Sequence, residues 1–143
     1  MSLFVLDVSV AIKWALPGVG ERLTTEALEL LNRFGKAEVE FIVPDLFWLE
    51  LGNALWKAVR IGRCAPPDAA EAMTAMRDRG LPTLASYGLL DQALSIAVTF
   101  DRTMYDSVYV ALAVQTQCEL VTADECLANA LAARFPVKWL GVV

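Results

Sequence analysis

LFVLDVS, residues Leu3–Ser9, is a short apolar run that is interrupted by the carboxylate of Asp7, and this stretch decides the fold. Its apolar residues occupy both alternating positions, which is typical of a strand covered on both faces, as in the parallel sheets of α/β proteins. Asp7 then lies at the carboxyl end of the strand. In open α/β sheets, ligands bind at that edge. The stretch therefore predicts a buried strand with a candidate site at its end.

Helices and strands are expected to alternate along the rest of the chain. Apolar faces bounded by Pro, Gly or capping residues predict helices at Ser9–Leu16 with a stop at Pro17, Glu21–Arg33, Pro44–Arg60, Pro66–Gly80, Leu89–Phe100, Thr103–Thr116 and Asp124–Arg134. Further strands are predicted at Val39–Val43, Leu81–Ala85, Glu119–Thr122 and Val137–Leu140. This alternation indicates right-handed crossovers and an α/β fold with helices on both faces of a parallel sheet. The 143 residues suffice for a single domain, 1–143.

The composition is unusually apolar for a domain of this size. Hydrophobic residues make up 57% of the chain and the mean hydropathy is +0.48. Another subunit or partner is therefore expected to cover part of the surface, and we expect a homodimer or a complex. Charged residues interrupt the apolar runs before they reach the ~20 residues of a membrane span. The first run also lacks the basic leader of a signal peptide, so a cytoplasmic protein without a membrane partner is predicted.

The residue types that are missing restrict the chemistry. The chain has no histidine, which excludes serine–histidine hydrolases, histidine-based nucleases and zinc sites with histidine ligands. Its three cysteines, Cys64, Cys118 and Cys126, form no paired motif, so neither a disulfide framework nor a zinc knuckle is expected. The net charge of −5 argues against a protein that only coats nucleic acid. It does not exclude a nuclease whose acids hold divalent cations.

Two aspartates each follow a predicted strand and precede a helix, namely Asp7 and Asp124. Ordinary helix capping can explain the residues at both strand ends. Asp124 is an N-cap candidate, Thr122 with Glu125 matches a capping box, and Ser9 is by default the N-cap of its helix. These explanations do not account for two separate strands that both end in Asp, so a shared site at one sheet edge is the competing interpretation.

Two more acids lie on helices. Glu50 shares a polar stripe with Lys57 and Arg60, and this stripe faces either solvent or a cleft. Asp106 lies three residues after Thr103, which fits a capping box, but the helix that follows is apolar almost all round and is expected to be central. Each acid alone is explained by structure. Together with the two strand-end aspartates they predict one acidic pocket.

Such a pocket requires cations. Carboxylates ~6 Å apart repel by roughly 3 kcal/mol per pair at an effective dielectric constant near 20. Hard divalent ions remove this repulsion, and Mg²⁺ and Mn²⁺ prefer ligation by oxygen alone. The sequence therefore predicts a Mg²⁺ or Mn²⁺ site.

The chain resembles the PIN-domain ribonucleases, and in particular the VapC toxins of toxin–antitoxin pairs. The matching segments are Val5–Ser9 (VLDVS), Pro44–Asp45 followed by Glu50, Tyr105–Ala113 (YDSVYVALA) and Leu120–Glu125 (LVTADE). The resemblance implies a three-layer α/β/α fold with a five-stranded parallel sheet in the order 3-2-1-4-5. It also implies a Mg²⁺- or Mn²⁺-dependent endoribonuclease that cleaves single-stranded RNA and is bound by an antitoxin protein.

Residue by residue, the resemblance assigns the metal and the catalysis to Asp7, Glu50, Asp106 and Asp124, with Ser9 and Thr122 as supporting hydroxyls. Lys57 and Arg60 are candidate RNA contacts, as is usual for cations near a phosphate-cleaving site. Cys126 stands where many relatives carry a further acid, so a fifth ligand is not expected.

Two other functions fit parts of this pattern. A phosphatase or phosphoacceptor domain also places Asp at strand ends around Mg²⁺, but the phosphatase motif D-x-D is absent because position 9 is Ser. A PIN-like scaffold that only binds protein would use the same acids as helix caps. No base-reading motif is visible, so the class of RNA stays open.

Overall fold

The computed structural model describes residues 2–16, 18 and 21–143. Within them, five strands form one sheet: β1 (Ser2–Leu6), β2 (Val39–Pro44), β3 (Thr83–Leu84), β4 (Glu119–Thr122) and β5 (Val137–Trp139). The strand order is β3-β2-β1-β4-β5, and every neighbouring pair is parallel. Both the predicted order 3-2-1-4-5 and the parallel direction are therefore confirmed.

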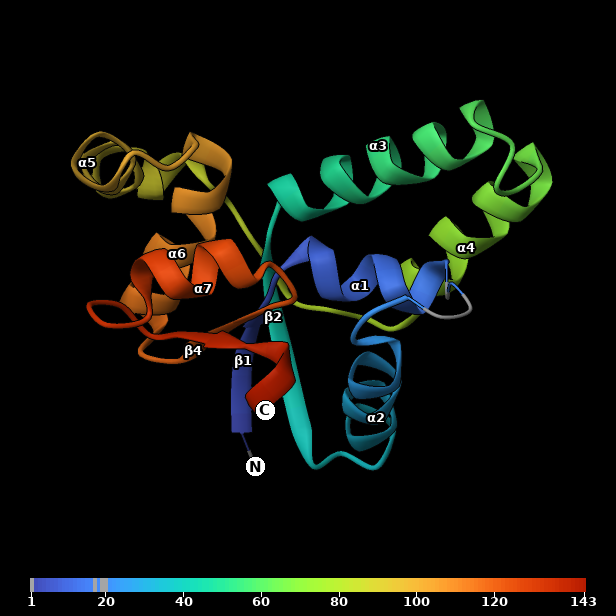
Figure 1. Ribbon diagram of the computed structural model, residues 1–143, viewed down its shortest axis with the longest axis horizontal. Helices are drawn as coiled ribbons and strands as arrows, with labels where there is room; N and C mark the ends of the chain where they lie inside the picture. The colour runs from blue at the N-terminus through green and yellow to red at the C-terminus, as the bar shows by residue number, and fades with distance from the viewer. Residues whose placement is uncertain (1, 17, 19–20) are drawn as a thin grey trace.

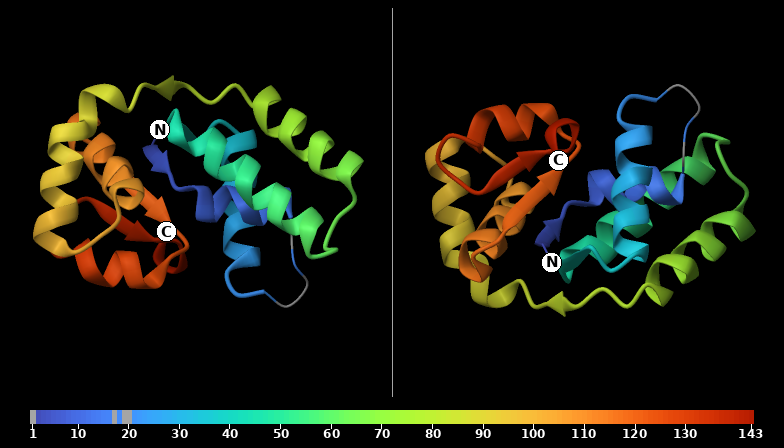
Figure 2. Two further views of the ribbon diagram at one scale, coloured as in Figure 1. Left: turned by 90° about the horizontal axis from the view of Figure 1, so that it is seen from above. Right: turned by 90° about the horizontal axis from the view of Figure 1, so that it is seen from below.

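Helices cover both faces of this sheet (Figures 1 and 2). One side carries α1 (Val8–Ala15), α2 (Thr24–Gly35), α3 (Leu46–Arg60) and α4 (Pro66–Asp78), and the other carries α5 (Leu90–Phe100), α6 (Met104–Thr116) and α7 (Glu125–Leu131). Two short 3-10 turns, η1 (Tyr87–Leu89) and η2 (Leu140–Val142), complete the elements. The three-layer α/β/α arrangement matches the prediction.

The core lies along β1 and α6. Val5 and Leu6 of β1 are completely buried, and every residue of α6 from Ser107 to Ala113 is buried. A helix that is apolar almost all round must be covered on all sides, and α6 packs against α5 as well as the sheet. The prediction that this helix is central is confirmed. The buried body of α6 holds the first turn of the helix, where Asp106 lies, in a fixed place.

Several predicted boundaries were wrong by a few residues. The edge strand predicted at Leu81–Ala85 is only Thr83–Leu84, because an edge strand has a single neighbour to pair with. The helix predicted from Glu21 begins at Thr24, after Leu23 adopts a left-handed φ of 67°. The stop predicted at Pro17 falls outside the described residues.

The last helix is also shorter than predicted. It was expected to run from Asp124 to Arg134 but ends at Leu131. The carbonyl of Leu131 accepts the backbone N–H groups of Arg134 (3.0 Å) and Phe135 (2.9 Å), which closes a turn that leads into β5.

The register of β1 against β4 brings two strand ends together. Leu6 pairs with Val121, and the next residue, Asp7, donates its backbone N–H to the Val121 carbonyl at 3.1 Å. The carboxyl ends of both strands therefore lie side by side, next to the start of α1.

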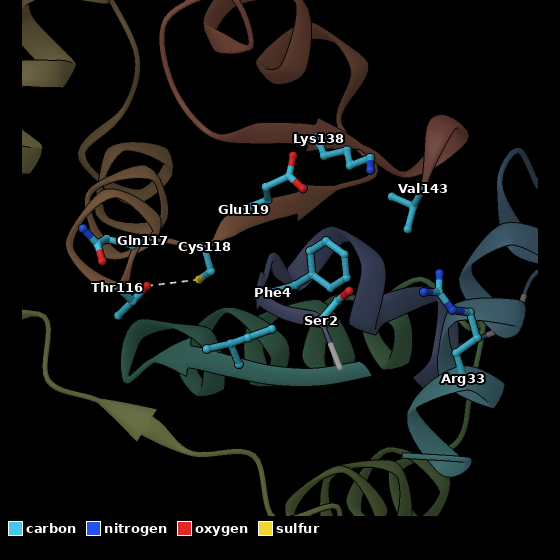
Figure 3. A pocket seen from close by; sticks show the side chains of 10 residues that line it. Ser2, Phe4, Arg33, Thr116, Gln117, Cys118, Glu119, Lys138 and Val143 are labelled. Atoms are coloured by element: carbon cyan, nitrogen blue, oxygen red, sulfur yellow. Dashed lines mark hydrogen bonds between the residues drawn. The ribbon is translucent and has the colours of Figure 1, made fainter. Parts of the chain in front are cut away.

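A pocket lies at the opposite edge, among the amino ends of the strands (Figure 3). It has a volume of about 470 Å³ and includes Ser2, Phe4, Cys118, Glu119 and Lys138 in its lining. A single acid is among the ten residues that line it, so this pocket has no cluster of carboxylates.

No helix in the described part of the chain has both the length and the apolar character needed to cross a bilayer.

Candidate metal centre

Asp7 is the buried centre of the candidate site, with only 6% of its surface exposed. Its Oδ2 accepts hydrogen bonds from the hydroxyls of Ser9 and Thr122, both at 2.7 Å. Each hydroxyl also accepts a backbone N–H at 3.0 Å, that of Ala123 in the case of Ser9 and that of Asp124 in the case of Thr122. The two hydroxyls thus connect the Asp7 carboxylate to the backbone that follows β4.

These contacts correct two capping predictions. Ser9 is not the N-cap of α1, because the helix already begins at Val8. Thr122 and Glu125 do not form a capping box, because the Glu125 carboxylate pairs with Arg22 at 2.9 Å. Both hydroxyls contact Asp7 instead, as expected for groups that support it.

Asp124 and Asp106 lie at the starts of α7 and α6. Asp124 is the N-cap of α7, and its Oδ1 accepts the backbone N–H of Leu127 at 3.1 Å. Thr103 caps α6 and accepts the N–H of Asp106, also at 3.1 Å. The carboxylate of Asp106 pairs with Arg102 at 3.2 Å, and both side chains are only about a quarter exposed (29% and 23%). Both N-caps therefore form, but the capping box expected of Thr103 and Asp106 is only half present, because the Asp106 carboxylate pairs with Arg102, a cation that the sequence did not single out.

Glu50 reaches the site from α3. It is half-buried, and its Oε1 accepts a hydrogen bond at 2.8 Å from the phenol of Tyr109, which is 1% exposed. Burial raises the pKa of Tyr109, and the nearby charges of Asp7 and Glu50 raise it further. The phenol therefore stays protonated at neutral pH and donates a hydrogen bond to Glu50. Sequence reasoning missed this role. The available signal was the spacing of three residues from Asp106 to Tyr109, which places both on one face of a helix.

Lys57 and Arg60 are exposed farther along α3. The 1.5 Å rise per residue places them about 10 and 15 Å from Glu50 along the helix axis. The guanidinium of Arg60 lies over the ring of Trp56, 5.5 Å from its centroid. Both side chains are therefore accessible to a ligand from solvent.

The four acids share one electrostatic neighbourhood. Burial raises the pKa of Asp7, and the charges of Asp106 and Asp124 raise it further, against the two hydroxyl hydrogen bonds that lower it. Burial also raises the pKa of Glu50, together with the charges of Asp7 and Asp106, while the Tyr109 hydrogen bond lowers it. The acids that the sequence singled out therefore influence one another: Asp106 and Asp124 act on Asp7, and Asp7 and Asp106 act on Glu50.

The donor atoms of these four acids are all carboxylate oxygens, the ligand type that a hard divalent cation prefers. Each of the four carboxylates uses one oxygen in a protein hydrogen bond, and within the described chain the other oxygen has no such bond: Asp7 Oδ1, Glu50 Oε2, Asp106 Oδ1 and Asp124 Oδ2. Among residues 2–16, 18 and 21–143, no three acids or thiols converge on one ion position. Mg²⁺ suits such a site, because it takes one or two carboxylates directly and keeps several waters. Cys126 is an exposed free thiol and adds no carboxylate.

Known proteins match the part of the chain that carries these four acids. The family model of the PIN domain matches residues 4–130. Among curated proteins, Ribonuclease VapC3 of Pyrobaculum aerophilum is 31% identical over 106 residues, which cover 73% of this chain and 81% of that protein.

Solved structures share the fold. PAE2754 from Pyrobaculum aerophilum has a TM-score of 0.73 at 23% identity and matches 99% of this chain and 85% of its own. A toxin–antitoxin complex from Klebsiella pneumoniae has a TM-score of 0.62 at 15% identity, covering 96% of both chains. VapBC2 from Rickettsia felis, bound to a DNA fragment from its promoter, has a TM-score of 0.66 at 10% identity, covering 96% of this chain and 98% of that one.

The buried charge of Asp7 gives a first prediction. Asp7→Asn removes that charge and keeps the shape of the side chain. In metal-free buffer at pH 7 it should therefore raise the unfolding temperature by about 3 °C, which for a chain of this size corresponds to ~1 kcal/mol in the free energy of unfolding. Because the pKa of Asp7 is raised in the folded state, stability is highest below the unfolded value and falls as pH rises through the raised value.

The difference between Asp7→Asn and the natural chain should therefore shrink as the pH is lowered towards about 4, the unfolded pKa. Thermal unfolding followed by circular dichroism from pH 4 to 8 measures it. A difference that grows on acidification would contradict the electrostatic assignment.

Proposed function

Because this chain belongs to the PIN-domain family, we propose that it is a metal-dependent endoribonuclease that hydrolyses phosphodiester bonds of single-stranded RNA. The observation that carries the proposal is the electrostatic coupling of Asp7, Glu50, Asp106 and Asp124, in which burial and the neighbouring carboxylates raise the pKa values of the first two. The ribonuclease name of the 31% identical relative supports the same activity. A chain without histidine is suited to this chemistry, since the nucleophile requires no protein base.

In this proposal the four carboxylates hold Mg²⁺ or Mn²⁺, one or two of them as direct ligands and the others through waters on the ion. A divalent ion at such a site lowers the pKa of a bound water and offsets charge on the phosphate. Ser9 and Thr122 keep one oxygen of Asp7 occupied, so the carboxylate holds one orientation. Lys57 and Arg60, exposed along α3, bind neighbouring phosphates of the RNA.

The proposed biological role is that of a toxin whose partner is an antitoxin protein. The name VapC3 of the relative and the toxin–antitoxin complexes among the structures with this fold support it. An antitoxin that inserts a cationic side chain among the acids would compete with the metal for them. The cytoplasm is the proposed compartment, because the chain has free thiols and its substrate would be there.

A homodimer is proposed for the apolar face of α5. Leu90, Leu94 and Val98 recur every four residues on this helix and are 41%, 53% and 76% exposed. A groove of about 360 Å³ adjoins Leu90 and is also lined by Leu49 and Tyr105, which are themselves exposed. Exposed apolar side chains gathered in this way are typical of an interface.

Cleavage of RNA is the direct test. We expect Asp7→Asn to lower the Mn²⁺-dependent cleavage of a single-stranded RNA by roughly two orders of magnitude or more, the scale of losing transition-state charge stabilisation. Asp91→Asn, at an exposed acid on α5, is the matched control and should cleave at the natural rate. Cleavage by Asp7→Asn at the natural rate would refute the assignment of the site.

Metal binding separates the nuclease from a protein-binding scaffold. Calorimetry with Mn²⁺ should detect binding to the natural chain and at least roughly tenfold weaker binding to Asp106→Ala, because a site built from acids loses affinity with each ligand removed. If the natural chain binds no Mn²⁺, or binds it equally well after the substitution, the scaffold is favoured. An aspartyl adduct formed from acetyl phosphate would favour a phosphoacceptor instead.

The dimer is tested by light scattering. The natural chain should have twice its mass of 15.6 kDa, and Leu94→Glu should be monomeric, because a charge at an apolar interface is costly to bury. Leu28→Glu, at an exposed leucine of α2 on the other side of the sheet, should remain dimeric. A natural chain that is monomeric at micromolar concentration would exclude the dimer.

A further inference from the structure

A buried tyrosine joins two helices at the acidic site. Tyr109 lies on α6 and is 1% exposed, and its hydroxyl donates to Glu50 of α3 at 2.8 Å across 59 positions of sequence. A hydroxyl buried without a partner costs free energy, and phenylalanine would fill the same space without that cost. The hydrogen bond to Glu50 therefore explains why a tyrosine occupies this position in an otherwise apolar run.

The spacing along α6 gives the tyrosine its place in the site. Tyr109 follows Asp106 by three residues, and side chains three apart lie on the same face of a helix. One face of α6 thus presents both a carboxylate and the hydroxyl that reaches Glu50. Because α6 is buried from Ser107 to Ala113, this hydroxyl is held by a rigid part of the core.

Glu50 depends more than the other three acids on a hydrogen bond from a distant residue to fix its side chain. Asp7 is fixed by two hydroxyls, Asp124 by the N–H of Leu127, and Asp106 by Arg102, each from a residue near in sequence or on an adjoining strand end. Glu50 has a longer side chain than the three aspartates and is half exposed.

The negative charges of Asp7 and Asp106 also act on Glu50. Repulsion of this kind drives a flexible, half-exposed glutamate out towards water, where its charge is better solvated. A neutral donor on the buried side opposes that movement. The Tyr109 hydroxyl is in place to do so.

We propose that Tyr109 is a positioning residue of the metal centre, which fixes Glu50 among the other carboxylates. The inference rests on the proposed function and deepens it. Tyr109 acts through Glu50 and touches neither the metal nor the RNA. Groups that orient metal ligands in this way typically contribute 10- to 100-fold to metal affinity or activity.

Substitution by phenylalanine tests the hydroxyl alone. In calorimetry on the full chain, Tyr109→Phe should bind Mn²⁺ about tenfold more weakly than the natural chain. Tyr87→Phe is the control, because Tyr87 is 86% exposed, and it should bind Mn²⁺ unchanged. If Tyr109→Phe lowers the unfolding temperature but leaves Mn²⁺ affinity unchanged, Tyr109 is only a structural residue and the inference fails.

A double-mutant cycle tests whether Tyr109 acts through Glu50. In a Glu50→Gln background, which retains the other three acids, adding Tyr109→Phe should change Mn²⁺ affinity by less than about twofold, because coupled residues are not additive. A full tenfold loss in that background would overturn the inference. If the natural chain itself binds no Mn²⁺, both the proposed function and the inference fail. If the natural and Tyr109→Phe chains bind Mn²⁺ equally well, only the inference fails.

Discussion

The parallel pairing of β1 with β4 is the constraint on which the acidic site depends. It places the end of one strand against the end of the other, so that Thr122 lies within 2.7 Å of the Asp7 carboxylate. The strand register is itself fixed by burial, since Val5, Leu6 and Val121 are all inaccessible to water. The position of a charged group is therefore set by apolar side chains on either side of the sheet.

The same core offsets the cost of holding like charges together. Each of the four carboxylates has a protein donor or cation of its own, and α6, which supplies Asp106 and Tyr109, is buried from Ser107 to Ala113. A buried charge without partners would shift the fold or remain protonated. The arrangement leaves one oxygen of each carboxylate without a protein hydrogen bond in the described chain, which is what a site for a hard cation requires.

The parallel sheet and the shared edge of its strand ends followed from the sequence for physical reasons, whereas the order of the strands was implied by the family resemblance. Apolar runs that end in Asp mark strand ends, and in a parallel sheet these ends share one edge. Tyr109 could not be found in this way, because it lies in a helix buried all round, where periodicity does not distinguish one face from another. Arg102 lies in the turn before that helix, and its pairing with Asp106 is a property of side-chain positions alone. The edge strand β3 was overestimated because its length depends on a single neighbour.

The separation of the site residues along the chain has a consequence during synthesis. Asp7 meets Thr122 across 115 positions, and Glu50 meets Tyr109 across 59. While translation is in progress, the first aspartate emerges long before the strand that must align beside it. The Asp7 carboxylate therefore lacks its Thr122 partner until the ribosome has passed position 122, so this end of the sheet is completed only late in synthesis.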